Sequence, residues 1–316
     1  MRTISLFLLL VILSLFIFSG QALAREEIFA ISDPVGDDHG PGTYNYPRHS
    51  DFAPYHGLLD ITQFSIERTE EYYYLVFSFE KLTNPWNKEY GFSHPLLELY
   101  IDNKEDGSGR SFQNAARVDF AEGFAWNKLL KISGEFVRLY YPEDEKEKQQ
   151  LIDITGDIIY PDWEVTDYNI RTRENDIILQ IAREEIGPLT GAKISILVGS
   201  FNPFGPGYFR ELRAESAGWF IYDSSIGQEE LNFAPRVMDV ILPEEKEQQK
   251  VLAGFSRGVF AEVYPIEVDP GYEEGSYVQN LVSLIRLVVL PVLLLFIIIT
   301  GFIFWKRPGQ KKGQGS

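Results

Sequence analysis

The sequence predicts an all-β protein, an antiparallel two-sheet β-sandwich, followed by one C-terminal transmembrane helix. Residues 72–79 alternate between two partly apolar faces with a period of two, which is typical of a β-strand. Several shorter β-branched runs are bounded by turn residues, as the buried strands of a sandwich are. A third observation, an almost wholly apolar stretch at 284–305, predicts the helix.

Composition and charge limit the class of protein. The 316 residues are 45% hydrophobic and include no cysteine, so the chain can build a sizeable core but no disulfide. All 46 acidic residues lie between Arg25 and Asn280, against 23 of the 29 basic ones. This span therefore has a net charge near −23. Such a surface repels nucleic acid, which we exclude as a partner.

Residues 1–24 have the pattern of a secretory signal peptide. Arg2 supplies the positive start, 6–18 the apolar run, and Ala22-Leu23-Ala24 the small-residue cleavage site. An uncleaved N-terminal anchor is the alternative. The sequence therefore predicts an exported domain over 25–266.

Further strands follow in chain order. Leu97, Leu99 and Ile101 alternate with Glu98 and Tyr100, which predicts a strand after 72–79. Other strands are expected at 117–120, 125–132, 135–140, 177–182, 194–198, 209–215, 219–222, 237–242 and 259–266.

Two short helices and two polar segments complete the domain. One helical turn is expected at 182–186, and a helix is expected to start at Pro243 and stop at Gly254. Residues 102–110 predict a hairpin loop. The charge run at 142–150 predicts a solvated loop or a short helix.

The C-terminal part predicts a membrane anchor. A linker at 267–283 leads into the apolar residues 284–305, which span about 33 Å as a helix, enough for a bilayer core. The tail at 306–316 is basic, so the positive-inside rule places it in the cytoplasm and the domain outside the cell. We therefore expect a single-pass protein of the cell membrane; a buried helix of a soluble protein is the alternative.

The turn-rich segment at 33–47 carries crowded carboxylates. Asp33, Asp37 and Asp38 repel one another unless a cation or backbone N–H groups neutralise them, and Asp60 could fold back to join them. Oxygen-only ligands favour Ca²⁺ over zinc or copper. We therefore expect these four aspartates to bind Ca²⁺, with capping of backbone N–H groups as the alternative.

Motifs that would indicate an enzyme are absent from the sequence. It contains no Gly-x-Ser-x-Gly, His-Glu-x-x-His or Gly-x-x-x-x-Gly-Lys. With 46 acidic residues, it also singles out no pair of carboxylates for glycoside hydrolysis. We therefore expect a non-catalytic protein, and an uncharacterised glycoside hydrolase remains an alternative.

Four stretches, in order, carry a family resemblance. Residues 33–47 read Asp-Pro-x-Gly-Asp-Asp-x-Gly-Pro-Gly-x-Tyr-x-Tyr-Pro. The later three are Asn84-Pro85-Trp86-Asn87 with Gly91-Phe92-Ser93, Phe204-Gly205-Pro206-Gly207 with Arg210-Glu211, and Pro235-Arg236-Val237-Met238-Asp239-Val240. Together they resemble the glucodextranase C-terminal domain family from about 33 to 265. The resemblance implies a DOMON-like β-sandwich of jelly-roll type, related to family-9 carbohydrate-binding modules.

Carbohydrate binding needs aromatic rings that stack on the C–H faces of sugars and polar side chains that bond their hydroxyls. The expected carbohydrate-binding residues are Trp86, Tyr46, Tyr44, Trp126, Asn84 and Asn87. For each ring, packing within its loop is the alternative.

The sequence thus predicts a membrane-anchored extracellular domain that holds polysaccharide or oligosaccharide at the cell surface, beside a separate glycoside hydrolase or transporter. A surface-layer or envelope attachment protein, binding protein or wall polymer, is the alternative.

Overall fold

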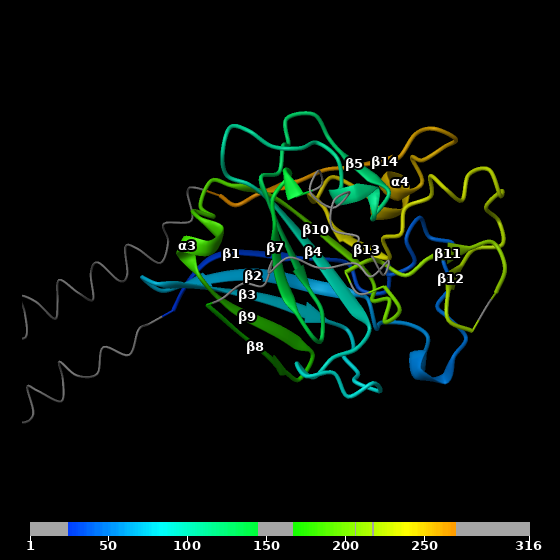
Figure 1. Cartoon of the computed structure of the whole chain (residues 1–316), viewed down its shortest axis with the longest axis horizontal. Helices are drawn as coiled ribbons and strands as arrows, with labels where there is room; N and C mark the ends of the chain where they lie inside the picture. The colour runs from blue at the N-terminus through cyan, green and yellow to red at the C-terminus, as the bar shows by residue number, and fades with distance from the viewer. Residues whose placement is uncertain (1–24, 145–166, 206, 217, 270–316) are drawn as a thin grey trace, which may run out of the picture. The chain divides into compact units, whose positions relative to one another are not determined.

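Antiparallel β-strands make up most of the computed structural model, which describes residues 25–144, 167–205, 207–216 and 218–269 (Figure 1). The signal peptide expected at 1–24, the transmembrane helix at 284–305 and the basic tail lie outside the described residues. Among the residues that are described, no helix is long and apolar enough to cross a membrane. The described residues belong to a single unit, Met1–Pro270.

The first large sheet has five strands in the order β1-β2-β3-β9-β8, and every neighbouring pair is antiparallel. Its strands are β1 (Glu26–Ser32), β2 (Ile61–Arg68), β3 (Tyr72–Phe79), β9 (Asp176–Ala182) and β8 (Tyr168–Arg173). In β3 the buried side chains of Tyr73, Leu75, Phe77 and Phe79 fall on alternate positions. This is the period of two that the sequence shows.

The second large sheet has the order β13-β10-β4-β6-β7, and β15 also pairs with β10. Its strands are β13 (Asp239–Ile241), β10 (Lys193–Ser200), β4 (Pro95–Asp102), β6 (Lys128–Ile132), β7 (Val137–Tyr140) and β15 (Ile266–Glu267). These pairings too are antiparallel. Figure 1 shows strands of this sheet lying over and crossing those of the first.

One hydrophobic cluster joins the two sheets. It contains Phe64 and Leu75 from the first sheet and Leu99 and Ile196 from the second. At about 25 cal/mol per Å² of apolar surface, such burial is the main force holding the sheets together. The prediction of an all-β protein with antiparallel sheets is therefore confirmed.

The second sheet is also buried on its outer face. Leu129 and Leu197 contribute to a second cluster there, together with Phe112 and Trp126 from the covering segments. Its central strands are therefore buried at nearly every position. This explains why β10 carries a run of apolar residues on both faces, and why the charged Glu98 of β4 and Lys131 of β6 are buried as an ion pair.

Short elements cover this outer face and the end of the molecule near residue 222. Two parallel pairs are β5 (Val118–Phe120) with β14 (Ala261–Val263), and β11 (Leu212–Arg213) with β12 (Ile221–Tyr222). The helices among the described residues are α3 (Arg183–Ile186) and α4 (Gln248–Leu252), with single 3₁₀ turns at Ser50–Phe52 and Phe112–Asn114.

The helical turn expected at 182–186 is confirmed by α3. The helix expected from Pro243 begins only at Gln248, so that prediction was wrong by about one turn. The cause is visible at Gln248, whose buried amide accepts a hydrogen bond from the backbone N–H of Val240 and donates one to the carbonyl of Asp37. These contacts fix where the helix begins.

Candidate ligand-binding site

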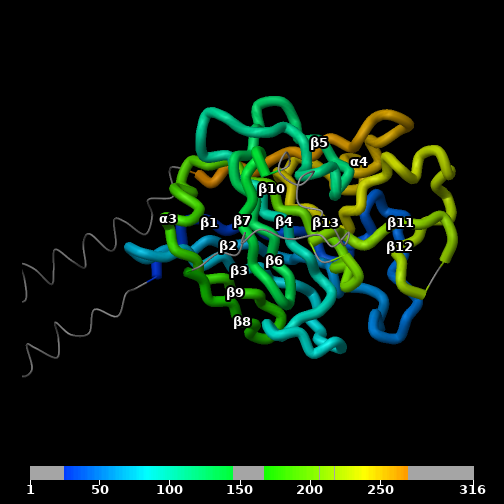
Figure 2. Tube along the Cα trace, viewed as in Figure 1, coloured from blue at the N-terminus to red at the C-terminus, as the bar shows by residue number. Residues whose placement is uncertain are grey.

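The turn-rich segment 33–60 packs against the residues around 222 and 238. The backbone N–H of Gly40 donates to the carbonyl of Met238 at 2.8 Å, and Asn45 forms a β-bridge with Tyr222. Gly40 has a φ of +56°, and a Cβ there would lie 2.4 Å from the ring of Tyr44. Glycine is therefore required for this tight turn. Figure 2 shows the segment, in blue, at the end of the molecule near β11 and β12.

This segment and β13 together form a group of neighbouring carboxylates. One oxygen each from Asp33, Asp37 and Asp239 lies within 4.8 Å of the others. Asp33 follows β1, Asp37 lies in the turn, and Asp239 begins β13 of the other sheet. Asp60, just before β2, and Asp38 are both fully buried beside them. Of the four predicted metal ligands, Asp33 and Asp37 thus offer oxygens close enough to share one ion, together with Asp239, and Asp38 and Asp60 lie beside them.

Backbone N–H groups hold part of this cluster. Asp239 accepts hydrogen bonds from Ile61 at 2.7 Å and from Val240 at 2.8 Å. Asp60 accepts one from Gly36 at 2.6 Å through Oδ2. Capping of backbone N–H groups thus falls on Asp239 and Asp60, whereas the alternative expected it at Asp33 or Asp37.

Four buried oxygens in the cluster accept no hydrogen bond from the described residues. They are Oδ2 of Asp33 and Oδ1 of Asp37, Asp38 and Asp60. Oδ1 of Asp38 lies 3.7 Å from Nε2 of His39, the only ion pair that these five carboxylates make within the described part of the chain. These five carboxylates therefore have few hydrogen-bond or ion-pair partners among the described residues.

The pKa values reflect this crowding. Burial, and then the neighbouring carboxylates, raise the pKa of Asp33, Asp60 and Asp239 well above the usual range. Burial raises the pKa of Asp37 to about 6, and Asp38 adds to that shift. Asp33, Asp37, Asp60 and Asp239 therefore resist ionisation unless positive charge compensates them.

A pocket with a volume of about 370 Å³ opens beside this cluster. It is lined by His39, Asn45, Tyr46, Arg48, Tyr55 and Tyr222. The Arg48 guanidinium lies 5.4 Å from the centre of the Tyr222 ring, and its Nε donates to the Tyr222 hydroxyl at 3.3 Å. Tyr55 is 45% exposed. The pocket thus offers aromatic rings, amide groups and a cation to one ligand.

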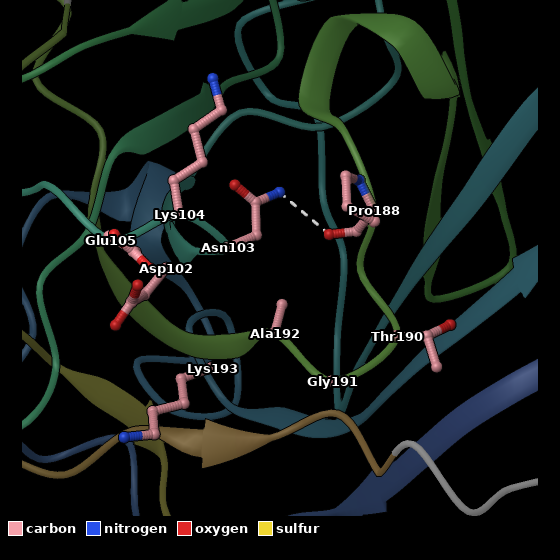
Figure 3. A pocket seen from close by; sticks show the side chains of 9 residues that line it. All are labelled: Asp102, Asn103, Lys104, Glu105, Pro188, Thr190, Gly191, Ala192 and Lys193. Atoms are coloured by element: carbon pink, nitrogen blue, oxygen red, sulfur yellow. Dashed lines mark hydrogen bonds between the residues drawn. The ribbon is translucent and has the colours of Figure 1, made fainter.

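A second pocket of similar volume lies between the loop after β4 and the segment before β10 (Figure 3). Asn103 spans it, donating through its amide to the carbonyl of Pro188 at 2.9 Å. Its lining contains Asp102, Lys104 and Lys193 but no aromatic ring. It therefore lacks the ring stacking that a sugar would use.

Two of the expected sugar-binding rings lie in the core, and those predictions were wrong. Tyr44 is 2% exposed and donates its hydroxyl to the carbonyl of Pro235 at 2.8 Å. Trp126 is fully buried in the outer cluster, where its Nε1 donates to the carbonyl of Arg110 at 2.7 Å. Neither ring has a face left for a ligand.

Tyr46 is a partial case. It borders the pocket, but only 4% of its surface is exposed and its hydroxyl donates to Asp38. It forms the pocket wall rather than a stacking platform, so the expected stacking role was wrong for this ring as well.

The other expected residues occupy the loop between β3 and β4. Trp86 is partly buried against both clusters, and its Nε1 donates to Asp51 at 2.7 Å. The Asn84 amide is used within the loop, bonding Lys88 and Ser93, whereas Asn87 is exposed. A role of this loop in binding stays a prediction.

Sequence reasoning missed Asp239, Tyr55 and Tyr222. Asp239 did carry a signal, because it interrupts the apolar run 237–242, where a carboxylate must be buried with a purpose. The two tyrosines carried none, since their proximity depends on how the 45–55 loop folds onto β12.

Comparison with known proteins supports a binding role. A family model described as the SLH-like C-terminal binding module of glucodextranase matches residues 28–265. No match to a curated protein was found.

Proposed function

This chain belongs to the family of SLH-like C-terminal binding modules of glucodextranase, and from that membership we propose that it is a non-catalytic carbohydrate-binding domain. Its sheets form a β-sandwich of jelly-roll type, and its ligand is a polysaccharide or an oligosaccharide. The observation that carries the proposal is the pocket lined by Tyr55, Tyr222 and Arg48 in a chain of this family.

The chemistry of the pocket suits a neutral glycan. The rings of Tyr55 and Tyr222 can stack on the C–H face of a sugar. Arg48 and Asn45 are exposed and can donate hydrogen bonds to its hydroxyls. A few convergent polar groups beside aromatic rings are the usual composition of a small-ligand site.

The proposed location follows from the ends of the sequence. The signal-peptide pattern at 1–24 and the apolar stretch at 284–305 support an extracellular domain anchored by a single helix. In this arrangement the domain holds glycan at the cell surface, next to a separate hydrolase or transporter.

A second candidate function is attachment to the cell envelope. The family description calls the module SLH-like, that is, similar to surface-layer homology modules, which favours a wall polymer or a surface protein as the partner. The two functions differ in whether a free glycan is bound.

The test is direct binding of soluble glycans to the purified full chain. The family is named after a glucodextranase, so dextran is the first probe, followed by a glycan array. Tyr55→Ala and Tyr222→Ala are each expected to weaken binding by about 1–3 kcal/mol. Tyr264→Ala is the matched control, because Lys246 packs over its ring at 3.6 Å as Arg48 does over Tyr222, yet it does not line the pocket. Binding to isolated envelopes without binding to any free glycan would support attachment instead.

A further inference from the structure

The carboxylate cluster calls for an explanation that glycan binding does not supply. Asp60 has no exposed surface, and while Oδ2 accepts the N–H of Gly36, Oδ1 accepts no hydrogen bond. Asp38 is equally buried and also leaves Oδ1 without one. An unpaired buried carboxylate oxygen is costly, and here four lie together. Capping by the backbone accounts for only part of the cluster.

We propose that Asp33, Asp37, Asp60 and Asp239 form a binding site for one calcium ion. Asp33, Asp37 and, from the opposite sheet, Asp239 each offer one oxygen within 4.8 Å of the others. The unpartnered Oδ1 of the buried Asp60 beside them supplies a fourth ligand atom. Asp38 is a positioning residue. Its Oδ2 accepts hydrogen bonds from Tyr46 and from the N–H of Gly57 at 3.0 Å, which anchors the turn that carries Asp37.

The donor atoms favour calcium among the metals, and the spacing of the oxygens is compatible with it. All the ligand atoms are oxygens, which select hard cations. Oxygens that bind one Ca²⁺ ion, at about 2.4 Å each, can be at most about 4.8 Å apart. The oxygens of Asp33, Asp37 and Asp239 lie within 4.8 Å of one another. Magnesium also seldom uses more than two carboxylates, because it keeps its waters.

Charge supports the same assignment. Four carboxylates around a dication leave a net negative site, which suits tight calcium binding. Burial, and after it the repulsion between neighbouring carboxylates, raises the pKa values of these aspartates, and a bound cation would offset both effects. In the described part of the chain, His39 alone forms an ion pair with the group, and it reaches only Asp38.

Such an ion would join three segments far apart in the sequence. Asp33 directly follows β1, and Asp60 directly precedes β2 in the same sheet. Asp239 belongs to β13 in the other sheet. In a chain without cysteine, a cross-link of this kind ties the sheets together as a disulfide would in other exported proteins.

The experiment uses the full chain, stripped with EDTA and titrated with CaCl₂ alone in a calorimeter. We expect one ion per chain and a melting temperature that rises by about 5–10 °C at a hundredfold excess over Kd. MgCl₂ is expected to give a smaller shift. Because no glycan is present, failure of this proposal is distinguishable from failure of the proposed function.

Asp60→Asn separates an ion site from simple capping. The asparagine carbonyl still accepts the Gly36 N–H, but one negative ligand is lost. Affinity for Ca²⁺ should fall at least tenfold. In EDTA the variant should melt at or above the wild-type temperature, because one repelling charge is gone, and in calcium it should melt below it. Glu244→Gln, at an exposed position, removes the same charge and should leave both values unchanged.

The proposal is overturned if calcium produces neither heat nor a thermal shift. It is also overturned if Asp60→Asn lowers the melting temperature equally in EDTA and in calcium, since that result assigns Asp60 to capping alone. Should Asp60→Asn not fold, Asp37→Asn gives the same comparison at a residue in the turn.

Discussion

The hydroxyl of Tyr46 donates a hydrogen bond to Oδ2 of Asp38 and accepts one from the backbone N–H of Leu59 at 2.9 Å. Tyr46 also borders the pocket beside Tyr55 and Tyr222. One buried side chain therefore contacts both the carboxylate cluster and the candidate sugar site, so a change in either can reach the other through this ring.

Tyr46→Phe removes this hydroxyl and keeps the ring. Asp38 then loses a donor, and the N–H of Leu59 retains only its contact with Asp38 at 3.4 Å. We expect the free energy of unfolding to fall by about 1–3 kcal/mol, the cost of leaving buried polar groups unpaired. Urea unfolding measures it. Tyr55→Phe, at an exposed ring, should have no effect, and equal midpoints for both variants would contradict the prediction.

Lys131→Met should be strongly destabilising. Lys131 and Glu98 form an ion pair at 2.6 Å with almost no exposure, and Lys131 also donates to the carbonyl of Gly207 at 2.8 Å. The variant leaves Glu98 as a buried unpaired charge, which costs about 3–5 kcal/mol.

The double variant Glu98→Gln/Lys131→Met should recover part of that loss, because no charge is then left unpaired. Thermal melts of the single and double variants measure the two effects. A double variant less stable than Lys131→Met would show that the pair contributes more than mutual neutralisation.

His94 should make stability depend on pH. Burial, with a contribution from the charge of Arg210, lowers the pKa of His94 to about 4. The unfolded chain binds a proton near its ordinary pKa of about 6.5, whereas the folded state does so only near 4, so stability falls as pH drops through this window. The loss should be roughly 3 kcal/mol at its largest.

The comparison is with His94→Gln, which cannot titrate. Unfolding midpoints of both proteins at pH 7 and pH 5 isolate the effect from that of the carboxylates, which titrate in both. The wild type should lose more stability than the variant over this interval. Parallel losses would mean that His94 is solvated.

Trp86→Ala tests whether this ring is structural. Its Nε1 bonds Asp51, and its ring packs on His94 with centroids 4.9 Å apart. We expect a loss of about 2–3 kcal/mol in stability, somewhat less than for a fully buried aromatic residue. Trp86→Phe, which removes only the Nε1–Asp51 bond, should cost about 1 kcal/mol. Full stability of Trp86→Ala with loss of glycan binding would restore the predicted stacking role.

Much of the fold could be predicted from the sequence, because a strand that buries one face alternates apolar and polar residues and a strand that buries both faces is mostly apolar. Residues 72–79 alternate, 177–182 are apolar except for Gln180, and both ranges correspond to strands, β3 and β9. The edge strands β1 and β8 were not predicted. Their burial alternates between partial and none at most positions, so they carry little apolar signal.

The site was harder to predict because it depends on contacts between distant segments. Tyr44 and Tyr46 are separated by one residue and share a face, but the sequence does not reveal that this face turns inward. The grouping of Asp33, Asp37 and Asp60 could be anticipated because they are close in the chain. Asp239 joins them only because β13 pairs with β10 and so lies over the start of β2.

The two ends of β10 lie in different surroundings. Near its start, β10 pairs with β15, and the backbone N–H of Val268 donates to the carbonyl of Ala192. The last described residues of the chain therefore lie at this end of β10. Five residues further on, Val198 pairs with Asp239 at the carboxylate cluster, about 17 Å along the strand. The last described residues, which pair with the start of β10, are therefore separated from the carboxylate cluster by most of the length of that strand. Fusing a reporter after residue 269 should for the same reason preserve binding, whereas circular permutation within the 45–55 loop should abolish it.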